Sequence, residues 1–98
     1  MDFKIIWSDP AIESLGEIVR HVARDNPVAA LELGRSLVNR VEPAAHFPQI
    51  GPLFSRSADV EYRCLTHGNY RLYYRLISGR DIIEVVAVRH TAREQPRF

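Results

Sequence analysis

The chain has 98 residues, 46% of them hydrophobic and 26% charged, with a formal net charge of +1. These values indicate one globular domain over residues 1–98 and exclude an intrinsically disordered chain, which is less hydrophobic. A single cysteine excludes an internal disulfide, and no apolar run approaches the ~20 residues that cross a bilayer. Because the first residues also lack the cationic and apolar pattern of a signal peptide, we expect a cytoplasmic protein with no membrane partner.

Positive charge is concentrated in the C-terminal part of the chain. Residues 62–98 contain seven arginines and three acidic residues, whereas residues 1–61 contain six basic and nine acidic residues. The guanidinium group is planar and forms paired hydrogen bonds with phosphate or carboxylate oxygens. The asymmetry therefore predicts that the C-terminal part meets a polyanion or an acidic partner. An ordinary solvated face is the alternative that composition leaves open.

The first half of the sequence predicts one strand and two helices. Residues 3–7, FKIIW, form a short apolar run that is typical of a strand. The SDP motif at 8–10 then caps and begins a helix, whose apolar residues recur at helical spacing over 12–22. The DNP motif at 25–27 ends this helix and begins a second one, which Pro43 should end or kink. Because the connection is short, we expect an antiparallel helical hairpin.

The second half predicts a connector and three strands. Residues 46–54 contain two prolines and a glycine, so we expect an irregular connector there, followed by mobile residues at 55–59. Strands are predicted at 60–66, 70–77 and 82–90, separated by turns that contain glycine. The order β-α-α-β-β-β predicts an α+β fold, with a mostly antiparallel sheet and the helical hairpin packed on one face.

The strand at 70–77 alternates between two kinds of side chain, which should lie on opposite faces of the sheet. The apolar set should face the helices and consists of Tyr70, Leu72, Tyr74 and Leu76. The other set, Arg71, Tyr73 and Arg75, should face outward. There the arginines could bind anionic groups, and Tyr73 could stack on a base with a contribution of ~1–3 kcal/mol. Ion pairs of Arg71 and Arg75 with Glu61 or Glu84 are the structural alternative.

The sequence resembles the RelE/ParE superfamily of toxins from bacterial type II toxin–antitoxin modules over roughly residues 3–94. The resemblance rests on segments in this order: DPAIESLGEIVRHVARDNPVAALELGRSLVNRV, FPQIGPLF, YRCLTHGNYRLYYRL and IIEVVAVRH. It implies a small toxin that a partner antitoxin neutralises in a hetero-oligomeric complex. It also implies one of two targets, because some members cleave mRNA in the ribosomal A site and ParE-like members inhibit DNA gyrase.

The RelE-like branch can be compared residue by residue. Arg71 in YRLYY matches the arginine of the family motif YRLVY, and Arg63 replaces a lysine of the preceding strand. A second lysine of that branch is replaced by Leu65, and no glutamate matches the glutamate–arginine–histidine set of other nucleases. His90 could supply the histidine of that set. If the protein is RelE-like, the catalytic residues would be Arg71, His90 and Arg63, with the arginines offsetting phosphate charge and the histidine moving a proton.

The ParE-like branch matches the sequence better. A histidine after the last strand, in VVAVRH, and the RCL segment near His67 are similar to features of ParE-like members. The resemblance therefore favours a gyrase inhibitor, with an mRNA interferase as the alternative and a degenerate toxin as a third reading. A histidine at 90 bonded to a neighbouring carbonyl would be merely structural. The predicted binding residues are Arg63, Arg71, Tyr73, Arg75, Arg89 and Arg93.

Metal and cofactor chemistry is not predicted. The four histidines and the cysteine do not have the spacing of metal ligands. No glycine-rich phosphate loop or G-x-S-x-G motif is present in the sequence. Cys64, inside an alternating strand, is expected to be a small buried side chain and not a nucleophile.

Overall fold

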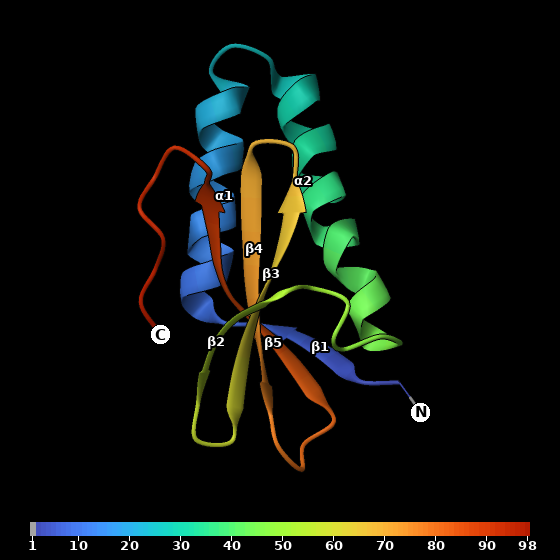
Figure 1. The fold of residues 1–98 in the computed structure, drawn as a ribbon. Helices are drawn as coiled ribbons and strands as arrows, with labels where there is room; N and C mark the ends of the chain where they lie inside the picture. Colours follow the sequence, from blue (N-terminus) through green and yellow to red (C-terminus); the bar gives the residue numbers. More distant parts are fainter. Residues whose placement is uncertain (1) are drawn as a thin grey trace.

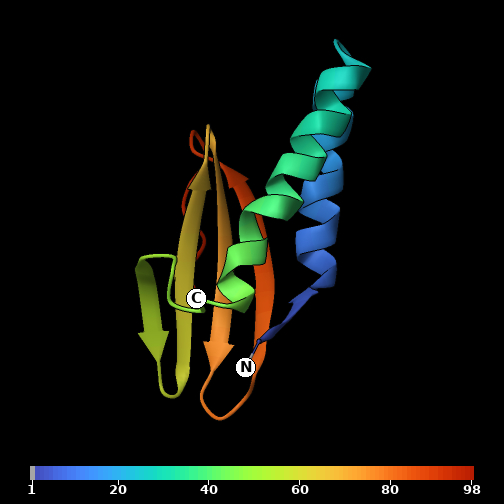
Figure 2. The same ribbon diagram turned by 90° about the vertical axis from the view of Figure 1, so that its right-hand side faces the viewer.

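The computed structural model describes residues 2–98, whose elements follow in the order strand, two helices and four strands (Figure 1). The helices are α1 (Asp9–Ala23) and α2 (Pro27–Val41), and the short 3₁₀ helix η1 (Glu42–Ala45) follows α2. The strands are β1 (Lys4–Trp7), β2 (Leu53–Ser57), β3 (Val60–His67), β4 (Tyr70–Ile77) and β5 (Ile82–His90). Figure 2 shows the helical hairpin on one side of the sheet. The predicted α+β fold is confirmed.

Side-chain caps fix where the two helices begin. The Ser8 hydroxyl accepts a hydrogen bond from the Ala11 N–H at 3.2 Å, and the Asn26 side chain accepts one from the Ala29 N–H at 3.0 Å. Each cap satisfies a backbone donor that the first turn of a helix leaves unpaired. α2 ends two residues before Pro43, as predicted, because proline lacks the N–H that would continue the helix. Within residues 2–98, neither helix is long and apolar enough to span a bilayer.

The five strands form one sheet in the order β1-β5-β4-β3-β2. β1 pairs parallel with β5, and the other neighbouring strands pair antiparallel. β2 corrects the prediction of a connector at 46–54 and mobile residues at 55–59, because Leu53–Ser57 pairs with β3. The segment LFSRS is short and has its two apolar residues side by side, so it lacks the alternation that predicts a strand. Its hydrogen bonds to the edge of β3, which are a tertiary contact, stabilise it.

The core lies between the helical hairpin and one face of the sheet. Leu72 and Tyr74 of β4 are completely buried there, with Ala11 of α1 and Leu37 of α2 in the same cluster. The remaining fully buried members are Val41, Ala44, Leu65, Ile83, Val85 and Val88. The alternation predicted for β4 is therefore confirmed on this side. Its odd-numbered residues lie on the opposite face, which we call the open face.

Tyr74 also holds the connector between η1 and β2 in place. Its hydroxyl donates to the Pro48 carbonyl at 2.7 Å and accepts from the Gly51 N–H at 3.0 Å. Gly51 approaches the ring so closely that a Cβ there would lie 3.0 Å from a ring carbon of Tyr74. Burial raises the pKa of Tyr74, so the phenol remains protonated and keeps both hydrogen bonds at neutral pH.

Candidate functional site

The register of the sheet decides which predicted residues share the open face. Residues directly opposite each other on neighbouring strands point to the same side of a sheet. Arg71 is opposite Arg89, and Arg75 is opposite Glu84. Since the intervening Leu72 belongs to the core, these four residues lie on the open face. Three of the predicted binding residues are thus brought together by β4 and β5.

Arg71 and Arg89 are charged groups without a counterion among the residues that the structure describes. Neither forms an ion pair with a carboxylate of residues 2–98. Arg89 is exposed and Arg71 is partly exposed. Like charges directly opposite each other destabilise a sheet, by an amount within the roughly 0.2–1 kcal/mol range of cross-strand pairs. The pair therefore presents two guanidinium groups that an external anion would neutralise.

Arg75 differs from this pair because its charge is neutralised within the sheet. The Arg75 Nε donates a hydrogen bond to the Glu84 carboxylate across the strands. Burial lowers the pKa of Arg75, but hydrogen bonds and charge interactions with Glu84 and Tyr62 outweigh this effect and raise it overall. Arg75 thus forms the ion pair with Glu84 that the sequence offered as the structural alternative to anion binding. This residue therefore contributes less to an anion-binding surface than Arg71.

Arg63, which the sequence predicts to be a binding residue together with Arg71, does not lie on the open face. It lies opposite Tyr74 and therefore on the side of the sheet that faces the helices. Its side chain is only 12% exposed and forms hydrogen bonds of 2.7 Å with Glu61 and 2.8 Å with the Gly51 carbonyl. The hydrogen bond from Arg63 lowers the pKa of Glu61. In this structure Arg63 supports the connector and does not share a surface with Arg71, because the pairing of β3 with β4 sets its direction.

Tyr73 is covered and does not form the exposed stacking surface that the sequence predicts. It is 1% exposed, with the Phe54 ring edge-on to it at a centroid distance of 4.9 Å. Phe98 lies 5.8 Å from Tyr73 and stacks on Tyr62 at 4.4 Å with an interplanar angle of 2°. Burial is the main cause that raises the pKa of Tyr73. Alternation correctly predicted its face but could not predict this cover, which comes from β2 and the C-terminal segment.

His90 points toward the helical side at the end of β5, because it lies opposite Tyr70. Its ring is edge-on to Tyr70 at 5.3 Å, and its Nδ1 accepts a hydrogen bond from the Ala92 N–H at 3.0 Å. A neutral ring that accepts at Nδ1 carries its proton on Nε2. The histidine thus has a backbone partner, although an N–H and not the expected carbonyl.

The predicted nuclease set is not brought together. Arg71 lies on the open face, whereas Arg63 and His90 lie on the helical side. Arg63 is opposite Tyr74 of β4, and His90 is opposite Tyr70 of the same strand. Because these two positions are four residues apart, Arg63 and His90 are separated by about 13 Å along the strand direction. Groups this far apart and on different faces cannot act together on one phosphodiester bond.

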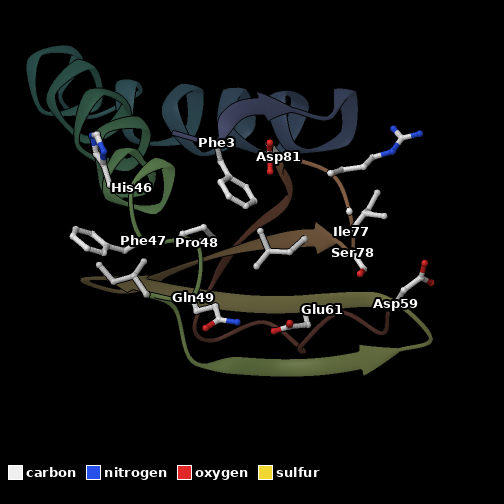
Figure 3. Close-up of a pocket in the computed structure, with 14 residues that line it drawn as sticks. Phe3, His46, Phe47, Pro48, Gln49, Asp59, Glu61, Ile77, Ser78 and Asp81 are labelled. Carbon is white, nitrogen blue, oxygen red and sulfur yellow. The ribbon is translucent and has the colours of Figure 1, made fainter. Parts of the chain in front are cut away.

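One cleft of the described structure is lined by none of the predicted site residues (Figure 3). Its volume is about 780 Å³, and it opens between the connector after η1 and the ends of β3 and β4. Figure 3 shows Phe3 on one side of it and Glu61 on the other. Phe47 and Ile50 of the connector are 67% and 43% exposed. Two apolar side chains in a proline-containing connector were the feature of the sequence that could have indicated this surface.

A second cleft of about 640 Å³ contains Arg93, the remaining predicted binding residue. It lies between α1 and the end of β5, where Arg89 and His90 also line it. Arg20 and Arg24 of α1 form the opposite wall. The sequence places these two arginines on the polar side of their helix, but only the packing of α1 beside β5 shows that they face Arg93.

No metal or thiol chemistry is indicated by the described part of the chain. Within residues 2–98, no three His, Cys, Asp or Glu side chains lie close enough together to hold a metal ion. Cys64 is half-buried, and burial raises the pKa of its thiol although the charge of Arg71 opposes this effect. The reactive thiolate is therefore disfavoured at neutral pH.

Solved structures with a similar fold come from toxin–antitoxin systems. A chain of the chromosomal ParDE system of P. aeruginosa has a TM-score of 0.72 and 19% identity, with 90% of this chain and 95% of that chain covered. A chain of the RelBE2 complex of Mycobacterium tuberculosis has a TM-score of 0.65 and 17% identity, with 92% of this chain and 99% of that chain covered. A chain of the archaeal RelE–RelB complex of Pyrococcus horikoshii has a TM-score of 0.55 and 15% identity, with 96% of this chain and 100% of that chain covered. At these identities the likeness shows the fold, which is that of the RelE/ParE-like toxins.

The family follows from the sequence comparison. Residues 5–95 match the family described as ParE toxin of the type II toxin–antitoxin system, parDE. Because the match spans nearly the whole chain, the chain belongs to the ParE toxin family. The resemblance to RelE/ParE toxins that the sequence predicts is confirmed. A comparison with curated protein sequences found no significant match.

Proposed function

We propose that this toxin acts in the cytoplasm as an inhibitor of DNA gyrase that binds its target and catalyses no reaction itself. The observation that carries the proposal is the separation of Arg63, Arg71 and His90. Cleavage of RNA requires that charge on the phosphate be offset and that protons move at two oxygens of the same bond. Arg71 lies on the opposite face of the sheet from the other two residues. Membership of the ParE family supports the same conclusion.

Arg71 and Arg89 are the residues that we expect to contact the target. They lie side by side on the open face and have no ion pair within residues 2–98. An acidic group of the gyrase complex placed between them would form charge-assisted hydrogen bonds with both guanidinium groups. It would also remove their mutual repulsion. Binding of this kind accelerates with electrostatic attraction and weakens as salt concentration rises.

A cognate antitoxin is the second partner that we propose. The matched solved structures are described as toxin–antitoxin systems and complexes. An antitoxin segment that is disordered when free could fold onto the toxin and cover Arg71 and Arg89. The antitoxin and gyrase would then compete for the same two arginines. The toxin would therefore not inhibit gyrase while it is part of a toxin–antitoxin hetero-oligomer.

A supercoiling assay tests the gyrase proposal. Purified wild-type toxin should block the supercoiling of relaxed plasmid by gyrase. Arg71→Gln and Arg89→Gln should each weaken the inhibition, and the double variant should abolish it. Arg80→Gln is the matched control, because Arg80 is an exposed arginine in the turn before β5. Undiminished supercoiling at excess wild-type toxin would refute the proposal.

An mRNA interferase remains the second candidate because one observation favours it. Arg71 matches the arginine of the YRLVY motif and lies on the open face with Arg89. Primer extension on translating ribosomes would then show new 5′ ends within codons, and these ends would disappear with Arg71→Ala. If expression of the protein harms cells in neither way, a degenerate toxin that only forms a complex with its antitoxin is the better description.

A further inference from the structure

The cleft between α1 and the end of β5, which we call the α1–β5 cleft, has an unusual concentration of positive charge. β1 pairs with β5 only as far as Val85, so the last residues of β5 form an edge beside α1 (Figure 1). Four arginines line the cleft with a single acidic residue, Glu17. Two arginines, Arg20 and Arg24, come from α1, and the other two, Arg89 and Arg93, come from β5 and the segment after it. The cleft is thus cationic on both walls.

The described part of the chain does not neutralise this charge with ion pairs. None of the four arginines forms an ion pair with an acidic side chain of residues 2–98. Even Glu17, three residues before Arg20 on α1, is not within 4.0 Å of its guanidinium group. Cationic groups on facing walls add their fields in the space between them, which attracts an anion into the cleft.

Gly16 shows that α1 makes room for one of these arginines. A Cβ at residue 16 would lie 3.0 Å from the Arg20 Nη1, so the guanidinium group occupies the space that the missing side chain leaves. Glycine in the middle of a helix costs about 0.5–1 kcal/mol relative to alanine. α1 therefore has a less stable residue at the place where the Arg20 head group lies against the helix. Arg24 follows one turn later, at a Cβ spacing of about 5–6 Å.

We propose that the α1–β5 cleft binds the phosphodiester backbone of a nucleic acid. Guanidinium groups form paired hydrogen bonds with phosphate oxygens, and binding to a nucleic acid backbone derives its free energy largely from the release of counterions. An acidic peptide is disfavoured because a disordered segment must bury apolar surface to offset the entropy lost on ordering. The larger apolar side chains that line the cleft are partly or fully buried, namely Ile18, Tyr70 and Val88, whereas all four arginines are exposed.

This site shares only Arg89 with the proposed gyrase contact and can be tested without gyrase. Arg89 lies where the open face adjoins the cleft, so the test uses Arg20, Arg24 and Arg93 instead. All three are exposed, and their replacement should leave the fold intact. Arg35→Gln and Arg80→Gln are matched controls, because they remove the same charge from exposed positions outside the cleft.

The measurement is fluorescence anisotropy of labelled duplex DNA, single-stranded DNA and single-stranded RNA with the purified toxin, over a series of salt concentrations. For wild type, log K should fall linearly with log salt. Each of Arg20→Gln, Arg24→Gln and Arg93→Gln should reduce the slope by about 0.9 for duplex DNA, or about 0.7 for a single strand. The comparison of the three probes identifies the form of nucleic acid that the cleft accepts.

A second variant tests the role of the helix glycine. Gly16→Ala should raise the thermal stability of the protein or leave it unchanged and should retain nucleic acid binding, because the flexible Arg20 guanidinium needs to move by only a few tenths of an ångström to admit the Cβ. The proposal is overturned if the cleft variants bind like the Arg35→Gln and Arg80→Gln controls. It is also overturned if polyglutamate of matched charge binds as tightly as the nucleic acids and depends on the same arginines, since the cleft would then be a site for acidic peptides.

Discussion

Arg71 and Arg89 lie directly opposite each other across β4 and β5, on the face of the sheet turned away from the helices. Neighbouring Arg75, on the same face, is instead opposite Glu84 and bonded to it. On this face, β4 and β5 therefore contribute one neutralised cross-strand pair and one repulsive pair. The repulsive pair reduces the stability of the free protein, whereas it should strengthen binding to an acidic target. Replacing one of its arginines should therefore raise stability and weaken binding.

The first prediction concerns this opposition. Arg89→Gln should leave the free energy of unfolding unchanged or raise it by about 0.2–1 kcal/mol, because a like-charge repulsion is removed. The same change should reduce gyrase inhibition. Urea unfolding at low and high salt measures the first effect, and the gain should shrink as salt screens the repulsion. Arg80→Gln should show neither effect. A clear loss of stability in Arg89→Gln would mean that the two arginines do not repel each other.

The second prediction separates a supporting residue from a binding residue. Arg63→Ala should destabilise the protein by about 1–3 kcal/mol, because it removes hydrogen bonds to Glu61 and to the Gly51 carbonyl in a poorly exposed site. Toxicity should fall only as far as the folded fraction falls. Circular dichroism during urea unfolding, compared with growth arrest after expression, distinguishes the two. A variant with full stability and no toxicity would instead assign Arg63 to the target contact.

The third prediction tests the anchor of the connector. Tyr74→Phe removes the hydroxyl that bonds both Pro48 and Gly51, so we expect a loss of about 1–3 kcal/mol in the free energy of unfolding. The Gly51 amide should also exchange its hydrogen faster. Tyr70→Phe is the control, because the Tyr70 hydroxyl forms no hydrogen bond within residues 2–98. Equal effects of the two changes would show that the anchor contributes nothing.

The fourth prediction follows from the cover over Tyr73. Phe98→Ala should expose the Tyr73 ring and lower its pKa toward the ordinary tyrosine value near 10, because burial is what raises it. An ultraviolet titration of the phenols at alkaline pH measures the change. Phe47→Ala, which removes an exposed ring outside this cluster, should leave the titration as it is in wild type. If Phe98→Ala also leaves it unchanged, the C-terminal residue does not cover Tyr73 in solution.

The fifth prediction concerns acid stability. The hydrogen bond from Arg63 lowers the pKa of Glu61 below its ordinary value of 4.5. A carboxyl group with a lowered pKa in the folded state stabilises the fold above its unfolded pKa, and this contribution disappears as pH falls through the folded pKa. Glu61→Gln should therefore cost about 1 kcal/mol at pH 7 and less below pH 4. Parallel pH profiles of stability for the two proteins would contradict the prediction.

Local sequence patterns determined the helical hairpin and the three long strands. The SDP and DNP motifs cap and begin the helices through contacts between residues three apart, as Ser8 with Ala11 and Asn26 with Ala29 show. Alternation along β4 placed Arg71 and Arg75 opposite the core face, because successive side chains of a strand point to opposite sides. These features depend only on near neighbours in the chain, so the sequence is sufficient to predict them.

The tertiary structure decided which of the predicted residues form a site. Alternation gives two faces to each strand, but the pairing between strands decides which face is buried, and this turned Arg63 toward the helices. Residues distant in sequence decided the rest, because Phe98 covers Tyr73 and α1 brings Arg20 opposite Arg93. Such contacts depend on how the elements pack against one another, and no periodicity within a single segment contains that information.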